Sequence, residues 1–255
     1  MVFSSPVFIF LFLPIVYLIN LVIPKRFSNI FLLLFSLMFY AWGEPLYVFL
    51  MIFSGLINFL LTLSISKRTD SRKIILLVAI VFNIGMLGLF KYADFLLLTI
   101  NGIMGTSLPM LNLPLPIGIS FYTFQTMSYV FDVYNHQTDV QKNYFSLLLY
   151  ITFFPQLIAG PIVQYHDIAK QIESRFVSLD KTVHGLRRFV IGLSKKVLLA
   201  NAMAVIADRL FALPNSQIST AVAWVGAVAY LFQIYFDFSG YSDMAIGMEI
   251  GRAHV

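Results

Sequence analysis

Two carboxylates, two serines and a tyrosine interrupt an otherwise apolar segment late in the chain. Within Phe236–Gly247 these residues are Asp237, Ser239, Tyr241, Ser242 and Asp243. A charged side chain in the hydrocarbon region of a bilayer costs roughly 3 kcal/mol or more, so it faces a protein interior or a water-filled cavity. We expect these residues to line a reaction tunnel or substrate site. The equal alternative is that the carboxylates form structural ion pairs with arginine or lysine.

Helix geometry limits how these side chains can meet. Gln233, Asp237 and Tyr241 recur every four residues and therefore share one helix face. Asp243 lies six positions beyond Asp237, which is about 120° round an unbroken helix. Both carboxylates can face one cavity only if the helix is interrupted, and we predict the interruption at Ser239–Gly240. Free backbone amides at such a break would also bind an anionic intermediate.

A second polar face is predicted earlier in the chain. Gln125 and Tyr129 lie four residues apart on one predicted helix, and Asp132 extends their face by a turn. A metal site from Asp132, His136 and Asp139 is conceivable, but three loosely spaced ligands are a weak signal. We expect these three residues to cap the helix end and to be solvated, and we predict no metal.

The apolar run 144–163 contains the residues Pro155, Gly160 and Pro161, which break helices. Broken backbone at membrane depth is tolerated only against protein or a water-filled cavity. We therefore predict a kinked or re-entrant segment here, with Gln156 lining the cavity.

A basic stretch, 183–211, is predicted to form one helix with its cations near one face. We favour an interfacial helix whose cations contact lipid phosphates. The functional alternative is that four cations bind the phosphates of a substrate at the cytoplasmic side. These are Arg187, Arg188, Lys195 and Lys196.

The composition indicates an all-α polytopic membrane protein. Of 255 residues, 59% are hydrophobic and 11% are charged, whereas about a quarter of the residues in soluble domains are charged. The net charge of +5 is interpreted as a topology signal, because no basic and aromatic groove for nucleic acid is visible. Without cysteine the chain has neither disulfides nor thiolate chemistry.

Apolar runs and basic loops predict a topology. A membrane-spanning helix needs roughly 20 residues. The runs are 7–23, 27–42, 46–65, 74–100, 117–133 and 144–163. By the positive-inside rule, Lys25, Lys67 and Lys195 are cytoplasmic and Asn112, in an uncharged Gly- and Pro-containing loop, is external.

Five sequence blocks together resemble the membrane-bound O-acyltransferases, in the branch that acetylates alginate and related exopolysaccharides. They are Pro116–Tyr129, Asp132–Tyr134, Pro155–Val163, Arg188–Val197 and Phe236–Gly247. The resemblance implies a multi-pass enzyme of the bacterial cytoplasmic membrane. It implies acetyl transfer from a cytoplasmic donor, acetyl-CoA or another acetyl carrier, to a periplasmic polysaccharide or carrier-protein partner. No bound cofactor is implied, and the presumed histidine base lies beyond this sequence.

The last residues depart from the family pattern. We interpret Glu249–Val255 as the translation of a common sequencing-library adapter, and residues 1–248 as a partial membrane-bound O-acyltransferase domain. His254 is then not the base, and the histidines at 136, 166 and 184 are expected in loops or near a helix start. Since positioned base catalysis contributes roughly 10²–10⁴ in rate, we expect the 255-residue chain to be inactive.

Three alternatives remain open. Intramembrane carboxylates and broken helices also suit a transporter or flippase, although no inverted repeat is visible. A nonenzymatic scaffold subunit is a second possibility. Within the family, the branch that adds D-alanine to teichoic acid is the nearest alternative.

Overall fold

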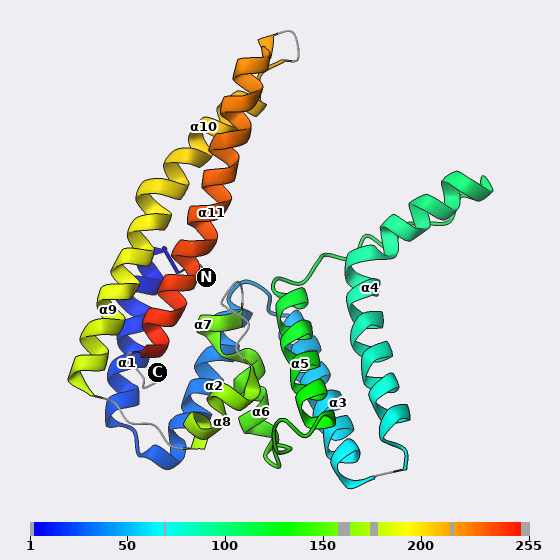
Figure 1. Ribbon diagram of the computed structural model, residues 1–255, viewed down its shortest axis with the longest axis vertical. Helices are drawn as coiled ribbons and strands as arrows, with labels where there is room; N and C mark the ends of the chain where they lie inside the picture. Colours follow the sequence, from blue (N-terminus) through cyan, green and yellow to red (C-terminus); the bar gives the residue numbers. More distant parts are fainter. Residues whose placement is uncertain (1–2, 69, 158–163, 174–177, 215–216, 251–255) are drawn as a thin grey trace. The chain divides into compact units, whose positions relative to one another are not determined.

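The structure, a computed structural model, describes residues 3–68, 70–157, 164–173, 178–214 and 217–250. These residues form helices joined by turns and loops, with no strand in the described ranges (Figure 1). The prediction of an all-α chain is confirmed.

Four helical stretches are long and apolar enough to cross a membrane. They are α3 (Tyr47–Lys67), α4 (Arg72–Met104), the continuous stretch Leu179–Phe211, and α11 (Thr220–Ile250) over Thr220–Glu249. The stretch Leu179–Phe211 comprises α9 (Leu179–Ser194), the π-helix η2 (Lys195–Ala200) and α10 (Asn201–Phe211). The protein is therefore a multi-pass membrane protein. Length and composition favour a membrane span over the interfacial helix predicted for 183–211. Lys195, which was predicted to be cytoplasmic, lies midway along this span, so the span and that prediction disagree.

The chain divides into two compact units, which are described separately. Among the described residues, the bundle unit comprises 20–157 and 164–172, and the hairpin unit comprises 3–19 and those from 173 onward. The shorter helices η1 (Phe8–Phe12) and α1 (Leu13–Val22) begin the chain, and α1 starts in the hairpin unit.

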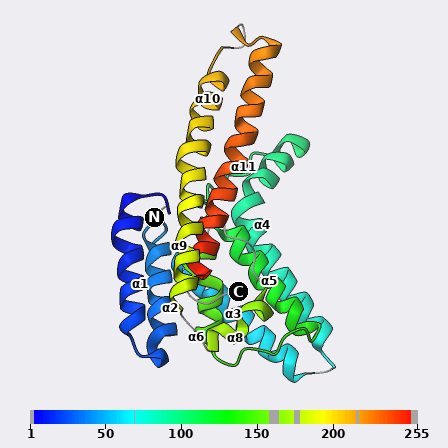
Figure 2. The same cartoon turned by 60° about the vertical axis from the view of Figure 1, so that its left-hand side comes forward.

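In the bundle unit, α3 packs against both α4 and α5 (Ile119–Tyr134), and the three lie side by side in both ribbon views (Figures 1 and 2). The helix α2 (Lys25–Ala41) packs against α6 (Tyr144–Thr152). The amphipathic α8 (Tyr165–Glu173) adds Tyr165 and Ile168 to the same core of buried side chains.

The connection from α4 to α5 begins and ends at glycines with positive φ, Gly105 at 64° and Gly118 at 76°. This left-handed conformation carries no Cβ penalty in glycine, so α4 can end sharply at Gly105 and α5 can begin sharply after Gly118. The Asp94 carboxylate of α4 accepts hydrogen bonds from the backbone N–H groups of Leu111 and Asn112, at 2.7 and 3.1 Å. These hydrogen bonds hold the loop against α4.

The predicted break in the run 144–163 is confirmed and lies at Phe153. This residue ends α6 with an extended ψ of 113°, and α7 (Phe154–Leu157) follows directly. Pro155 lies in the first turn of α7, where its missing N–H costs little. The Phe154 N–H donates to the Ser36 hydroxyl oxygen at 3.3 Å, which satisfies a buried donor at the break. Gly160 and Pro161, also expected at this break, lie outside the described residues.

The hairpin unit is built on two long antiparallel helical stretches. The stretch α9–η2–α10 runs alongside α11 over its length in both views (Figures 1 and 2). The predicted interruption of α11 at Ser239–Gly240 is wrong, because α11 is a continuous helix from Thr220 to Ile250. Residues 251–255 of the proposed adapter-derived tail lie outside the described residues.

Candidate functional site

The Asp243 carboxylate on α11 binds two cations of the neighbouring stretch. Its Oδ2 lies 2.6 Å from Lys195 Nζ, and its Oδ1 accepts a hydrogen bond from Arg188 Nε at 3.1 Å. Lys195 Nζ also donates to Ser239 Oγ at 3.0 Å. Lys195 therefore joins two side chains that follow one another by a helical turn on α11.

The second carboxylate has a cation of its own. Lys196 Nζ lies 2.6 Å from Asp237 Oδ1, and the Asp237 side chain is 46% exposed, compared with 16% for Asp243. Asp237 and Asp243 face different directions because six residues of unbroken helix separate them. In the structure each of the two carboxylates thus contacts a cation, as the ion-pair alternative predicted.

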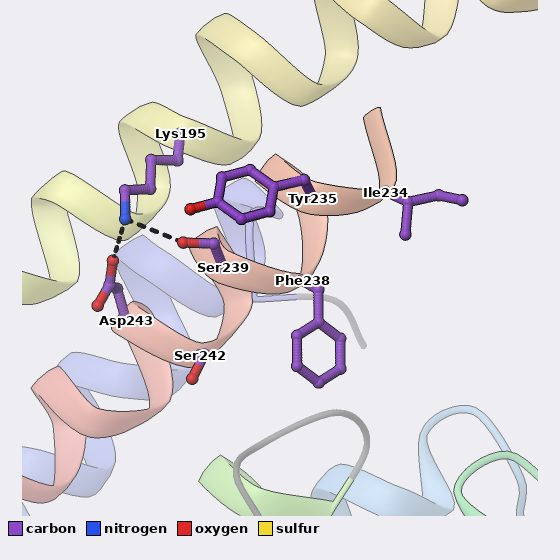
Figure 3. A pocket seen from close by; sticks show the side chains of 7 residues that line it. All are labelled: Lys195, Ile234, Tyr235, Phe238, Ser239, Ser242 and Asp243. Carbon is purple, nitrogen blue, oxygen red and sulfur yellow. Dashed lines mark hydrogen bonds and ion pairs between the residues drawn. The ribbon is translucent and has the colours of Figure 1, made fainter. Parts of the chain in front are cut away.

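A pocket of about 440 Å³ opens beside the Lys195–Asp243 pair (Figure 3). Its lining residues are Lys195, Ile234, Tyr235, Phe238, Ser239, Ser242 and Asp243. Figure 3 shows the Tyr235 hydroxyl directed toward the Lys195 ammonium group and the Phe238 ring on the neighbouring turn of α11. The pocket combines an ion pair, three hydroxyls and two aromatic rings.

Glycines bring the two stretches close enough for these contacts. A Cβ on Gly192 would lie 2.5 Å from the Gly240 carbonyl oxygen, and a Cβ on Gly240 would lie 2.7 Å from the Gly192 carbonyl oxygen. A Cβ on Gly247 would lie 2.6 Å from the Gly185 carbonyl oxygen. Small residues at helix interfaces allow backbones to approach in this way. Gly240 is therefore a packing residue rather than a helix breaker. The seven-residue spacing from Gly185 to Gly192 and from Gly240 to Gly247 is a signal that sequence reasoning missed.

The other sequence-predicted residues of this unit lie outside the pocket lining. The Gln233 Oε1 atom is buried and makes no hydrogen bond within the described residues. The Tyr241 ring stacks on Phe3 with centroids 4.5 Å apart. Arg187 is exposed, and only Lys195 of the four proposed phosphate contacts lines the pocket.

In the bundle unit, the structure brings together Gln125 and Gln156, which were predicted at two separate sites. Gln125 Nε2 donates to Gln156 Oε1 at 3.3 Å and to the Tyr150 carbonyl oxygen at 3.0 Å. Both glutamine side chains are buried. These two hydrogen bonds satisfy the buried Gln125 amide N–H group and the Gln156 side-chain oxygen beside the break between α6 and α7.

Tyr129 and Asp132 of α5 contact the segment that follows. The Tyr129 hydroxyl oxygen accepts a hydrogen bond from the Gln141 N–H at 2.9 Å. Asp132 Oδ2 lies 3.9 Å from His166 Nδ1. His166 is the second residue of α8, which agrees with the expectation that it lies in a loop or near a helix start.

A buried amide pair in this unit was missed. Asn58 Nδ2 donates to Asn83 Oδ1 at 3.2 Å, and Asn83 Nδ2 donates to Asn58 Oδ1 at 2.7 Å. Both side chains are fully buried between α3 and α4. The single asparagine within each of two consecutive apolar runs, 46–65 and 74–100, was the available signal.

No group of three or more His, Cys, Asp or Glu side chains in the described ranges could hold a metal ion. His136 was one of the three residues of the weak metal candidate. In the structure its Nε2 lies 2.6 Å from Arg72 Nη1.

Comparison with known proteins identifies the family. Residues 138–254 match the model of the membrane-bound O-acyltransferase family. Over 98% of the chain, the sequence is 42% identical to a probable alginate O-acetylase, AlgI, of Pseudomonas syringae pv. tomato. Residues 138–254 belong to the membrane-bound O-acyltransferase family.

Two further relatives define the range of the resemblance. A peptidoglycan O-acetyltransferase of Helicobacter pylori is 34% identical over 98% of the chain. A teichoic acid D-alanyltransferase of Bacillus subtilis is 26% identical over 55% of the chain. The chain spans about half the length of the relatives that match over 98% of it, 49% of the Pseudomonas syringae protein and 54% of the Helicobacter pylori protein. The transporter alternative is not favoured by these matches.

Proposed function

We propose that this membrane-bound O-acyltransferase transfers an acetyl group to hydroxyls of an exopolysaccharide such as alginate. The observation that carries the proposal is the 42% identity to probable alginate O-acetylases over 98% of the chain. Its location would be the bacterial cytoplasmic membrane. Peptidoglycan is the second candidate acceptor, because a peptidoglycan O-acetyltransferase is 34% identical over the same share of the chain.

The donor in this proposal is acetyl-CoA or another acetyl carrier on the cytoplasmic side. The acceptor is a periplasmic polysaccharide or a carrier-protein partner. Multi-pass architecture supports a reaction that joins substrates from opposite sides of a membrane. Membrane lipid surrounds the spans.

Acetyl transfer to a hydroxyl needs a base for the hydroxyl proton and donors for the developing oxyanion. In the hairpin unit, Lys195 and Ser239 are hydrogen-bond donors beside the pocket, and Asp243 is an acceptor. None of the described histidines lines this pocket. We therefore assign the pocket to binding and positioning rather than to proton abstraction.

The test is an acetyl-transfer assay in isolated membranes. Membranes that carry the protein expressed from its genomic reading frame are incubated with isotopically labelled acetyl-CoA and de-acetylated alginate. Alkali-labile label on the polymer is expected, and membranes with the empty vector are the control. Label on peptidoglycan alone would favour the second acceptor, and label on neither polymer would contradict both.

A further inference from the structure

The pocket beside Lys195 is poorly suited to the phosphates of an acyl donor. Of the cations considered for that role, Lys195 alone lines it, and the Asp243 carboxylate already binds the ammonium group at 2.6 Å. Arg188 is bound to the same carboxylate, and Lys196 is bound to Asp237. A phosphate entering the pocket would meet a carboxylate as well as the lysine, and like charges at close range repel.

The same lining suits a hydroxyl-rich ring. Asp243 can accept a hydrogen bond from a ligand hydroxyl, while Lys195 and the hydroxyls of Tyr235, Ser239 and Ser242 can donate. Ligand sites typically combine aromatic or apolar walls with a few placed polar groups, within roughly 300–1,000 Å³. The pocket of about 440 Å³ falls in this range.

The aromatic side chains supply the wall of such a site. Phe238 and Tyr235 line the pocket yet are 52% and 61% exposed, so neither is buried as core. An exposed ring beside a polar cluster can stack on the C–H face of a sugar while the cluster binds its hydroxyls. Ser242 and Phe238 lie one turn apart, so polar and apolar contacts reach one ligand from the same helix face.

We propose that this pocket binds a sugar ring of the acceptor polymer, and not the acyl donor. The proposal rests on the acetyl-transfer function proposed above and assigns a substrate class to this site. A uronate ring brings only one negative charge, so the Asp243 carboxylate repels it less than it repels the several charges on the phosphates of an acyl donor, and the Lys195 ammonium group can bind both carboxylates. Selection between rings then depends on the hydroxyls of Tyr235, Ser239 and Ser242.

The experiment measures binding without turnover. The protein expressed from its genomic reading frame is purified into lipid nanodiscs and titrated with a mannuronate tetrasaccharide and, separately, with acetyl-CoA. The variants Ser242→Ala and Tyr235→Phe each remove one hydroxyl from the pocket. Tyr230→Phe is the matched control, because Tyr230 lies on the same helix, is 49% exposed and does not line the pocket.

Each pocket variant should weaken tetrasaccharide binding about three- to tenfold, the usual effect of losing one hydrogen bond. Binding of acetyl-CoA should be unchanged, and Tyr230→Phe should affect neither ligand. Thermal melting of each variant confirms that the fold is intact.

Two results would overturn the assignment. Weaker acetyl-CoA binding with unchanged tetrasaccharide binding would make the pocket a donor site, and unchanged binding of both ligands would exclude it from either role. The acetyl-transfer assay separates this inference from the proposed function. Hydroxyl-dependent tetrasaccharide binding by a protein that transfers no acetyl group would support the pocket and contradict the reaction.

Discussion

At the scale of single residues, the two carboxylates of α11 have different surroundings. Asp243 binds both Lys195 and Arg188 and is 16% exposed, whereas Asp237 binds Lys196 and is 46% exposed. Breaking a largely buried ion pair leaves an uncompensated charge, while exposed pairs contribute little. Loss of the ion pair should therefore lower the free energy of unfolding more at Asp243 than at Asp237.

The substitution Asp243→Asn should destabilise the protein by about 1–2 kcal/mol, because it removes the shared partner of Lys195, which is 31% exposed, and of Arg188, which is 43% exposed. Asp237→Asn should cost about 0–1 kcal/mol, since its pair is half exposed. Thermal unfolding of the detergent-purified variants measures the difference. Equal melting shifts for the two variants would show that burial does not distinguish them.

These two variants also bear on function. If Asp243 only stabilises the fold, acetyl transfer by membranes carrying Asp243→Asn should fall in proportion to protein abundance. If Asp243 binds substrate, transfer should be lost at normal abundance. Normal transfer by both Asp243→Asn and Asp237→Asn would exclude a functional role for either carboxylate.

At the scale of helices, close backbone approach organises the hairpin unit. A methyl group on Gly240 has no room beside the Gly192 carbonyl oxygen at 2.7 Å. Farther along the same helix, a Cβ on Gly226 would meet its nearest atom, Leu210 Cβ, at 3.5 Å, an ordinary contact. Gly240 and Gly226, both on α11, thus offer a matched comparison.

We expect Gly240→Ala to destabilise the protein by about 1–3 kcal/mol, because overpacking must separate α9 from α11. Gly226→Ala should be neutral or stabilising by up to about 1 kcal/mol, since alanine is the better helix former. Thermal unfolding of both variants tests this, and a stabilised Gly240→Ala protein would contradict the close approach.

The amide pair between α3 and α4 predicts a non-additive pair of substitutions. Asn58→Leu or Asn83→Leu alone leaves a buried amide without its cross-helix partner, which should cost about 1–3 kcal/mol. The double variant should be more stable than the sum of the two single losses, because it removes both polar groups. A double-mutant cycle by thermal unfolding measures the coupling. Strict additivity would mean that the amides do not stabilise one another.

At the scale of the whole molecule, α4 separates two loops that were predicted on opposite sides of the membrane. Lys67 ends α3 immediately before α4, and Asn112 lies in the loop after it. Since α4 is long enough to span, the predicted cytoplasmic and external positions are compatible with one crossing.

The chain contains no cysteine, so single cysteines can report this topology. In intact cells, Leu111→Cys should react with a membrane-impermeant maleimide, and Lys67→Cys should react only after the membrane is opened. Leu111 is used in place of Asn112 because Asn112 has a positive φ of 49°, which disfavours other side chains. Labelling of Lys67→Cys in intact cells would reverse the predicted orientation.

The sequence by itself determined the membrane class, the all-α architecture and the apolar helices at 46–65 and 74–100. Hydrophobic run length and the need to satisfy every backbone group within a lipid-facing segment are local properties, so they can be read along the chain. The same holds for the break near Pro155, since proline acts on its own backbone and that of its neighbours.

Only the tertiary structure decided that α11 continues through Ser239–Gly240, that Lys195 binds Asp243, and that Lys196 binds Asp237. The sequence around Gly240, taken alone, predicted an interruption of the helix. In the structure, Gly240 packs against the backbone of Gly192, and this packing compensates for the low helix propensity of glycine. Which cation meets which carboxylate depends on the rotation and axial offset of α9 and α11, and these quantities exist only once the two helices have packed.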